Sequence, residues 1–590
     1  MSNPLARRNA VRILVALLAL PLISWIMDRC SMRVEIDSYL FSYAFWANAI
    51  PVAIVLALLI LVTRRVLWPS LVLLVGLVAL YAVNLLKLRY LASPLSLADY
   101  YFVRDMDWGS ARLFLRYVDL KLVGGGCVLA VAMLVALWRH ERPMSTRSRP
   151  LLRFCLFMLI ACGGYLLVPG PAGAAIYGGG RLRVLPYDGV ATQFRAGLLS
   201  DLIHAAHDMA GAFNEPVDRS AVHGLLASIG VPIEAQGQSA PELPDVVVIQ
   251  SESFFNPDLI EQVGDTHVLL PRLHQAMDEG MSGQMIVPTF GGGTIRTEFE
   301  VLTGIPLAAY QKVQFPYLQM SRSNMPSMAR VFASAGYQTA AVHGNSGDFW
   351  RRYSAFRSLG FDKFITAKEF GEDAYRDGWY LSDHSMTDEI IGQLGTNDRP
   401  KFVFAISIEA HGPYRRPPVK DTGRREQIAV PADFSEDARE EYSRYAYHIS
   451  DADHEFGRLW DYLKARHRPF VLVFYGDHLP GFQYIYDQAK FRNGLAANLQ
   501  HVPWVAVGSG IGKSGKRDLF AWMLSSEVLQ LADVKGTPYL TLVGTAGDRV
   551  LHEPDGSPAS NTMLEGLYSA ARLDLNGEFD SFDKAADHAE

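Results

Sequence analysis

The stretch PTFGGGTIRTEFEVLTG, residues 288–304, places three glycines directly before Thr294, at the point where a helical pattern begins. Glycines let the backbone approach a ligand closely, and the first amides of a helix favour an anion. Thr294 could therefore meet a phosphate or a metal-bound oxygen. In the alternative interpretation Thr294 only caps the helix, with Thr297 or Glu298 completing the capping hydrogen bonds. The rest of the chain favours the first interpretation.

Short β-rich runs alternate with helical segments on both sides of this stretch. The runs are residues 245–250, 338–342, 402–408, 470–476 and 502–508. Helical patterns cover residues 325–335 and 438–465. Buried runs separated by helices predict an α/β domain whose mainly parallel sheet is covered on both faces. Ligands of such sheets bind at the carboxyl ends of the strands.

Polar side chains follow three of these predicted strands. Glu252 follows the first, Glu409 and His411 follow the run at 402–408, and Asp477 and His478 follow the run at 470–476. Any one of them alone would more often be a turn residue or a surface acid. Several at equivalent strand ends, with a hydroxyl oxygen from Thr294, predict a site for a hard or borderline divalent cation.

The first third of the chain is strongly apolar, and the whole chain is 49% hydrophobic. Apolar runs of membrane-spanning length cover residues 11–27, 43–62, 67–86, 122–138 and 151–168. We therefore predict a bundle of five transmembrane helices. The first run is followed by Asp28, Arg29 and Cys30 and not by a small-residue cleavage site, so we expect it to be retained as a span.

Arginines cluster before the first span, between the second and third, and between the fourth and fifth. The positive-inside rule places these loops in the cytoplasm, so an odd number of spans puts the later residues outside it. All four cysteines lie in or beside the spans, and the outer domain must fold without disulfides. The net charge of −6 combines a basic membrane region with an acidic outer part and argues against a nucleic-acid partner.

We expect four parts along the chain. Residues 1–170 form the transmembrane domain, residues 171–240 a connector, residues 241–545 the catalytic domain, and residues 546–590 an acidic, loosely held tail. The connector has a helical pattern at 192–213 whose apolar side suits either the bilayer surface or the face of the catalytic domain.

Five motifs together carry a family resemblance. They are IQSESFF, FGGGTIRTEFEVLTG, HGNSGDFWRR, EAHGPY and FYGDH, in this order behind the membrane spans. The chain resembles the lipoteichoic acid synthase and phosphoglycerol transferase family, within the alkaline phosphatase and sulfatase superfamily. The resemblance covers residues 244–507 most strongly and implies an alkaline phosphatase/sulfatase-like fold.

The resemblance also implies roles for individual residues. One divalent metal ion, usually Mn²⁺ or Mg²⁺ in this family, would be held by Glu252, Thr294, Asp477 and His478, with Thr294 as the nucleophile. The phosphoglycerol group would contact His343, Trp350, Arg352 and His411.

These roles agree with the chemistry of the side chains. A metal-bound hydroxyl loses its proton more readily, so Thr294 could attack a phosphodiester near neutral pH. Arg352 offers a fork of donors for phosphate, and His411 or His343 could protonate the departing alkoxide. For Trp350, packing in the core is as good an interpretation as contact with glycerol.

Other members of the superfamily fit less well. Sulfatases use a modified cysteine, and no cysteine lies near Thr294. Phosphoethanolamine transferases usually carry disulfides in the outer domain, and lipoteichoic acid synthases tend to have a polar residue where this chain has Gly293. The resemblance is therefore to the Gram-negative branch that decorates periplasmic glucans.

We expect an enzyme of the inner membrane with its catalytic domain in the periplasm. It would move phosphoglycerol from phosphatidylglycerol to a glycan or polyglycerolphosphate-type acceptor through a phosphothreonine, releasing diacylglycerol. One alternative is a phosphoethanolamine transferase, whose substrate ammonium would need a carboxylate such as Asp348 or Glu409. The other is an inactive lipid-binding membrane protein. The neutral and cationic character of the remaining site residues favours glycerol.

Three further features are expected to have no catalytic role. GSGIGKS at 508–514 is one residue short of a phosphate-binding loop, and we expect a turn. HISDADHEF at 448–456 lies in a long predicted helix, and we expect a solvated face with one structural acid. His384 and His501 have no partner that the sequence identifies.

Overall fold

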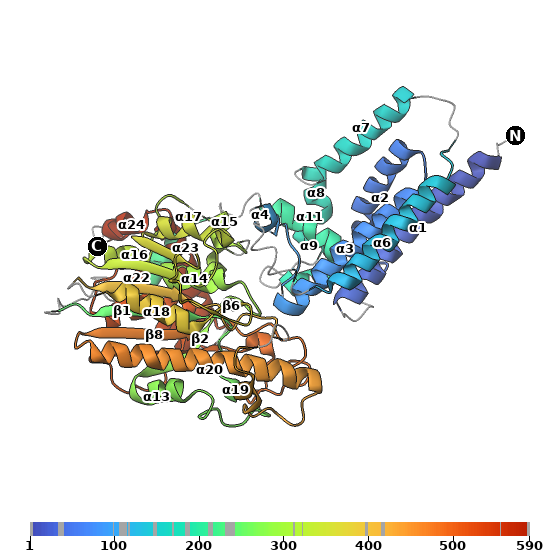
Figure 1. Ribbon diagram of the computed structural model, residues 1–590. Coiled ribbons are helices and arrows are strands. Elements are labelled where there is room, and N and C mark those ends of the chain that lie inside the picture. Colours follow the sequence, from blue (N-terminus) through green and yellow to red (C-terminus); the bar gives the residue numbers. More distant parts are fainter. Residues whose placement is uncertain are drawn as a thin grey trace. The chain divides into compact units, whose positions relative to one another are not determined.

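The computed structural model describes residues 4–32, 40–91, 93–97, 99–104, 115, 118–144, 150–167, 170–182, 189–209, 216–229, 242–310, 313–320, 322–395, 399–414, 419–554 and 556–586. The chain forms two compact units (Figure 1). One comprises Met1–Val103 and Ala111–Phe213, and the other comprises Arg104–Ser110 and Asn214–Glu590. Each unit is described by itself.

The first unit is a bundle of apolar helices. Its long helices are α1 (Pro4–Met32), α2 (Tyr43–Thr63), α3 (Leu67–Leu91) and α6 (Leu120–His140), and the shorter α4 is Asp99–Arg104. Among the described residues, these four long helices are long and apolar enough to cross a membrane. Helices α7 (Pro150–Leu166) and α8 (Pro171–Tyr177) are bent by 63° and make a fifth span if they are counted together. The predicted bundle of about five apolar helices is confirmed.

The helical pattern expected at 192–213 is interrupted. The structure has α9 (Gly179–Leu182), α10 (Gly189–Ala196) and α11 (Leu198–Met209), and residues 210–213 lie outside the described part. Gly197 separates α10 from α11 with a φ of 77°, which favours glycine. Leu198 and Leu199 pack into the same apolar cluster as Leu56 of α2. The apolar side of α11 is therefore used within the first unit.

The second unit is built on one large sheet. Its strands are β1 (Asp245–Ser251), β2 (Met281–Ile286), β3 (Gln338–His343), β4 (Lys363–Thr366), β7 (Lys401–Ile406), β8 (Phe470–Gly476), β9 (Val502–Gly508) and β10 (Leu519–Phe520). Their order is β10-β2-β9-β8-β1-β7-β3-β4. Five of the seven pairings are parallel, and β9 is antiparallel to both β2 and β8. The predicted mainly parallel sheet is confirmed.

Burial explains which strands the sequence predicted. Every residue of β1, β7 and β8 is buried, and each reads as a nearly continuous apolar run. β2, β4 and β10 were not predicted, because each is short or carries polar residues on a partly exposed face. A separate antiparallel pair, β5 (Arg376–Asp377) and β6 (Tyr380–Leu381), lies outside the main sheet.

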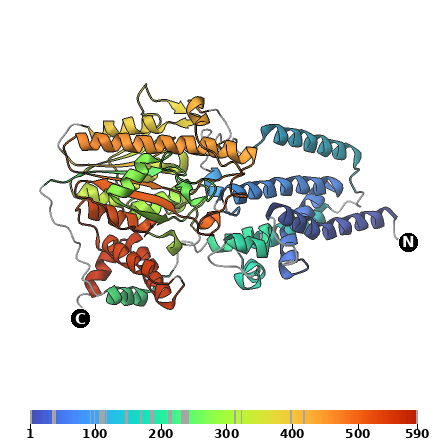
Figure 2. The same ribbon diagram turned by 90° about the horizontal axis from the view of Figure 1, so that it is seen from below.

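Helices cover both faces of the sheet (Figures 1 and 2). They are α12 (Arg219–Ile229), α13 (Pro271–Glu279), α14 (Thr294–Thr303), α15 (Pro316–Gln319), α16 (Met328–Ser334), α17 (Arg352–Leu359), α18 (Asp383–Leu394), α19 (Thr422–Glu426), α20 (Glu436–Ala465), α21 (Leu524–Leu531), α22 (Pro538–His552), α23 (Pro558–Leu575) and α24 (Phe579–Ala586). The long helix α20 contacts β8, α13 and α18, whereas α14 contacts α15, α16 and α21.

The expected loosely held tail after residue 546 is wrong. Helices α22, α23 and α24 pack together, and α23 contacts α12. Leu567, Ala571 and Leu575 recur at helical spacing and are buried in the main core with Phe579. The acids that suggested a tail share helices with these buried apolar residues. The division of the chain at residues 170, 240 and 545 stays a prediction.

Candidate active site

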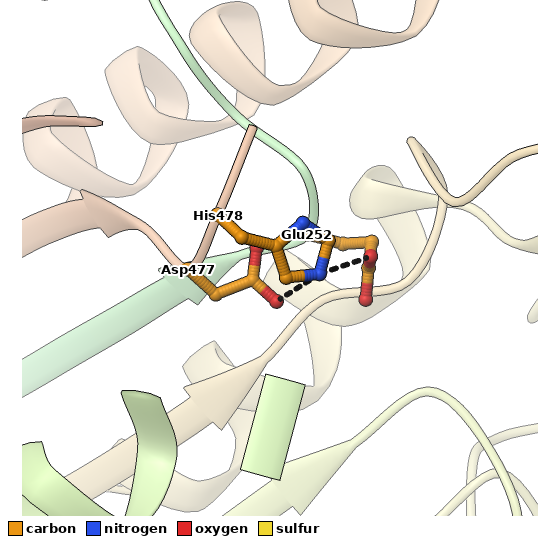
Figure 3. Close-up of side chains that lie close together, drawn as sticks. All are labelled: Glu252, Asp477 and His478. Carbon is orange, nitrogen blue, oxygen red and sulfur yellow. Dashed lines mark ion pairs between the residues drawn. The ribbon is translucent and has the colours of Figure 1, made fainter. Parts of the chain in front are cut away.

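The three strand-end residues Glu252, Asp477 and His478 lie together (Figure 3). β1 and β8 are parallel neighbours, and Ser251 pairs with Gly476, so the two strands end at the same level. His478 Nε2 lies 3.3 Å from Asp477 Oδ2 and 3.5 Å from Glu252 Oε1. All three side chains are buried. The sheet register brings together the residues that the sequence had placed only at separate strand ends.

Two atoms of this group are buried without a hydrogen-bond partner among the described residues: Asp477 Oδ2 and His478 Nε2. His478 Nδ1 lies 2.9 Å from the carbonyl oxygen of Leu479, which can only accept, so Nδ1 carries a proton. In the neutral ring, Nε2 then presents a lone pair toward two carboxylates. One imidazole nitrogen and two carboxylates converging in this way fit a divalent metal ion.

The surroundings of Glu252 also fit a cation. Burial, and then the charge of Asp477, raise the pKa of Glu252 to about 8. Ser253 holds both acids, because its backbone N–H donates to Asp477 Oδ1 (2.7 Å) and its hydroxyl donates to Glu252 Oε1 (2.9 Å). Like charges held this close in a buried site are costly unless a positive charge joins them.

Thr294 begins helix α14 beside this group. Gly291, Gly292 and Gly293 have φ angles of 70°, 155° and 81°, which favour glycine. The Thr294 hydroxyl donates to Glu252 Oε2 at 3.3 Å. The N-cap position belongs to Gly293, so the interpretation of Thr294 as a helix cap is wrong. The glycines instead turn the chain so that the hydroxyl meets the metal candidates.

Helix α14 is fixed against the end of β8. Thr297, one turn into the helix, donates its hydroxyl proton to the carbonyl oxygen of Asp477 at 2.7 Å. This bond ties the helix that carries Thr294 to the loop that carries Asp477 and His478. The position of Thr294 relative to the metal candidates is therefore fixed by a direct contact.

Arg352 is held by Glu298, for which the sequence indicated only a capping role. Glu298 lies four residues after Thr294, and its Oε2 accepts from Arg352 Nη2 at 2.8 Å and from Nε at 3.2 Å. Both side chains are almost completely buried. The spacing of four residues on a helix was the available signal, because it places Glu298 on the same face as Thr294.

His343, at the end of β3, accepts a hydrogen bond from Arg352. Its Nδ1 lies 3.1 Å from the carbonyl oxygen of Ile406 and must donate, so Nε2 accepts from Arg352 Nη1 at 3.2 Å. Burial and the charge of Arg352 hold the pKa of His343 well below its ordinary value. His343 is therefore neutral and orients Arg352, and it is poorly suited to donate a proton.

His411 and Trp350 are half-buried. His411 Nδ1 lies 2.7 Å from the carbonyl oxygen of Gly412 and 3.2 Å from the Tyr380 hydroxyl. His411 and Arg352 both lie near enough to His343 to lower its pKa, and Arg352 lies near enough to Glu252 to lower the pKa of that acid. The substrate-binding candidates are therefore neighbours of the metal candidates. Trp350 stacks on Phe315 with ring centroids 5.1 Å apart, which is the core-packing interpretation.

The backbone before Arg352 is in an unusual conformation. Trp350 and Arg351 have φ angles of 59° and 53°, in the left-handed region. Such residues cost on the order of 1–3 kcal/mol each and are found at functional sites. The strained pair directs the chain so that Arg352 begins α17 with its side chain toward Glu298.

The structure confirms some and contradicts others of the predictions for the segments 508–514 and 448–456 and for His384. The chain turns at Gly508–Ile511, as expected for the GSGIGKS segment. The solvated face expected at 448–456 is wrong, because His448, Asp453 and Glu455 are buried. Asp453 is the structural acid that was expected, since it accepts from the backbone N–H of Leu273 at 2.6 Å. His384 has a partner, Glu455 Oε1, at 3.0 Å from its Nδ1.

The sequence of the second unit matches a known family. Residues 244–534 match the sequence model of the sulfatase family. The chain carries a sulfatase-family domain. The matched range begins just before β1 and includes all eight strands of the main sheet, Thr294 and the metal candidates.

Two curated relatives come from Rhizobium meliloti. A putative cyclic beta-1,2-glucan modification protein is 29% identical over 434 residues, covering 70% of this chain and 63% of the relative. The capsular polysaccharide biosynthesis protein RkpI is 27% identical over 266 residues, covering 44% of each chain. The alignments thus span less than two thirds of these relatives.

Solved structures share the fold of the sulfatase-family domain. Streptococcus pyogenes phosphoglycerol transferase GacH, in complex with sn-glycerol-1-phosphate, has a TM-score of 0.51 at 21% identity and covers 61% of this chain and 94% of its own. Neisseria meningitidis lipooligosaccharide phosphoethanolamine transferase A has a TM-score of 0.55 at 14% identity and covers 91% and 98%. At these identities both show the fold alone.

Proposed function

We propose that this chain is a metal-dependent phosphoglycerol transferase of the inner membrane with its catalytic unit in the periplasm. It would move phosphoglycerol from phosphatidylglycerol to a glycan or polyglycerolphosphate-type acceptor. The observation that carries the proposal is the Thr294 hydroxyl bonded to Glu252, within a group that contains the unpartnered Asp477 Oδ2 and His478 Nε2. A binding protein without catalysis has no evident need of that arrangement.

The reaction would occur in two displacements. Thr294 Oγ attacks the phosphorus of the phospholipid and gives up its proton, while the bond to the diacylglycerol oxygen breaks and that oxygen takes up a proton. An acceptor hydroxyl then attacks the phosphothreonine and gives up its proton, while the bond from phosphorus to Thr294 breaks and Thr294 Oγ takes up a proton. When bound, Mn²⁺ or Mg²⁺ would acidify the hydroxyl and draw charge from the phosphoryl oxygens.

The protein residues would supply orientation and proton transfer. Arg352 has five N–H donors, of which three are used by Glu298 and His343, so two can meet phosphoryl oxygens. His411 is the better candidate for the proton donor, because His343 is neutral and already accepts from Arg352. Trp350 would border the glycerol only with the ring face that does not stack on Phe315.

The two nearby acids favour glycerol over ethanolamine. Glu409 is buried, and its two oxygens accept from His448 Nδ1 at 2.9 Å and from the backbone N–H of Asp383 at 2.6 Å. Asp348 is exposed and pairs with Lys368 at 3.4 Å. Asp348 is thus balanced by a lysine, and both oxygens of Glu409 accept from donors of the protein, although these donors leave its charge unbalanced. A site for phosphoethanolamine would need a carboxylate for the ammonium group.

The relatives support a transferase without naming the donor. The likeness to GacH suggests phosphoglycerol, and the likeness to the phosphoethanolamine transferase suggests the alternative. The putative cyclic beta-1,2-glucan modification protein of Rhizobium meliloti suggests a glucan as acceptor. The experiment must therefore offer both donors at once.

The test is a competition in lipid nanodiscs that contain equal amounts of phosphatidylglycerol and phosphatidylethanolamine. With full-length protein and Mn²⁺, we expect diacylglycerol to form at the expense of phosphatidylglycerol. Thr294→Ala should abolish the reaction, whereas Thr562→Ala, an exposed threonine on α23, should not. Mass spectrometry should find phosphoglycerol on the peptide that contains Thr294.

Two results would contradict the proposal. Consumption of phosphatidylethanolamine, lost in Asp348→Asn or Glu409→Gln, would show that the donor is wrong. Turnover by Thr294→Ala near the parent rate would exclude the phosphothreonine and with it the double displacement.

A further inference from the structure

A second group of acids lies in the same unit, outside the site described above. Carboxylate oxygens of Asp377, Glu409 and Asp451 lie within 4.8 Å of one another. Asp377 ends β5, Glu409 follows β7, and Asp451 lies on α20. Asp377 and Glu409 are buried, and Asp451 is half-buried. Three elements far apart in sequence thus bring their acids to one point.

A fourth acid, Asp383, makes this group unusual. It is the first residue of α18, and its backbone N–H donates to Glu409 Oε2 at 2.6 Å. Asp383 is only 5% exposed, and both of its carboxylate oxygens lack a hydrogen-bond partner among the described residues. Burial, and then the charges of Glu409 and Asp451, raise the pKa of Asp383 well above the ordinary value, and the bond to Glu409 places the start of α18 beside the group.

The positive charge beside these four acids is small. Arg424 Nη1 lies 2.5 Å from Asp451 Oδ1. His448 Nδ1 lies 2.9 Å from Glu409 Oε1, but burial lowers the pKa of His448 and favours its neutral form. Asp377 Oδ2 accepts only from a neutral donor, the Tyr447 hydroxyl, at 2.7 Å.

Among the described residues, these four acids thus have one permanent cation, Arg424, beside them. Buried acids in this situation either take up protons or bind a cation, because an unpaired buried charge is very costly. A divalent cation would offset two of the unbalanced charges. It would also give the two oxygens of Asp383 a partner.

We propose that Asp377, Asp383, Glu409 and Asp451 form a second cation site that binds one Ca²⁺ ion. The site would present carboxylate oxygens from four separate elements, namely the end of β5, the start of α18, the loop after β7 and the middle of α20. An irregular set of this kind suits the flexible six to eight oxygen ligands of Ca²⁺ better than the strict octahedron of Mg²⁺. His448 Nδ1 lies 2.9 Å from Glu409 Oε1, and among the described residues the group of Asp377, Glu409 and Asp451 includes no imidazole, the ligand that favours zinc.

The position of the site gives it a role. Glu409 lies two residues before His411, and Tyr380, three residues after Asp377, contacts His411 through its hydroxyl. A bound Ca²⁺ would join β5, the start of α18 and the loop after β7. It would thereby fix the loop that presents His411 to substrate.

The test uses full-length protein in which the first site is disabled by Asp477→Ala. After equilibration with Ca²⁺ and removal of free ion, elemental analysis should find one Ca²⁺ per chain. Adding Asp383→Asn should remove it, because a neutral amide replaces the unpartnered carboxylate. Adding Asp348→Asn, at an exposed acid, should leave the bound Ca²⁺ unchanged.

Thermal unfolding separates ion binding from misfolding. In chelator, the Asp383→Asn variant should unfold at or above the temperature of the Asp477→Ala protein, because it loses an unpaired buried charge. Ca²⁺ should raise the unfolding temperature of the Asp477→Ala protein and leave that of the double variant unchanged.

The proposal is overturned if the Asp477→Ala protein binds no Ca²⁺ at millimolar concentration. It is also overturned if Asp383→Asn retains the ion, or if Mn²⁺ displaces Ca²⁺ at equal concentration. Displacement of Ca²⁺ by Mn²⁺ would show that this site has the same metal preference as the site of Glu252, Asp477 and His478.

Discussion

Replacing Glu298 by glutamine tests the contact that holds Arg352. The substitution keeps the size of the side chain and removes its charge, so Arg352 stays buried without its counter-ion. Glu298 is fully buried and Arg352 is 2% exposed by side chain, so solvent screens neither group. Breaking one partner of a buried ion pair costs about 3–5 kcal/mol, because the other charge is left uncompensated.

That cost corresponds to a measurable change in unfolding temperature. The entropy of unfolding is about 2.1 cal/mol/K per residue, which gives about 0.8 kcal/mol/K for a unit the size of residues 214–590. A loss of about 4 kcal/mol then lowers the midpoint by about 5 °C. Transferase activity should fall as well, since Arg352 no longer has a fixed orientation toward the phosphoryl group.

A double-mutant cycle with Arg352→Gln separates this contact from general damage to α14. The two single variants should each be destabilised, and the double variant should be less destabilised than their sum, with a coupling of at least about 1.5 kcal/mol. Calorimetry of the full-length protein in detergent, with lipid present, gives all four midpoints. Effects that add to within about 0.5 kcal/mol would refute the argument that this pair acts as a unit.

Two more predictions concern the first metal site and the same helix. Chelation should stop turnover, and Mn²⁺ or Mg²⁺ should restore turnover in the parent protein. Neither ion should restore turnover in Asp477→Ala, because the metal affinity of this variant should fall by more than about 100-fold. Full activity of the parent protein in chelator would contradict this prediction. Burial raises the pKa of Glu300 from 4.5 to about 8, so its ionisation destabilises the folded state as pH rises from about 4.5 to about 8. The free energy of unfolding of Glu300→Gln should equal that of the parent near pH 4.5 and exceed it by up to about 5 kcal/mol above pH 8. A difference that does not change with pH would show that Glu300 does not titrate in this range.

The sequence determined the sheet and the metal candidates. β1, β7 and β8 are buried on both faces, and such strands must be apolar along their whole length. Parallel strands end at one edge, so Glu252, Asp477 and His478 could be assigned to one site before their distances were known. The glycines before Thr294 likewise marked the turn that presents its hydroxyl.

The tertiary structure alone decided which buried charges meet. Arg352 is 54 residues from Glu298, and His448 is 39 residues from Glu409. Helical spacing places Glu298 on the face of Thr294, but no local pattern identifies Arg352 as its partner or His448 as the partner of Glu409. The sequence also failed to predict the burial of part of helix α20. Its charged stretch at 448–456 has the composition of a solvated face, but α13, α18 and the loop after β7 cover it. Local sequence sets which backbone conformations are favourable. The partner of a buried polar side chain depends on how separate elements pack, because only that packing determines which charges lose their water together.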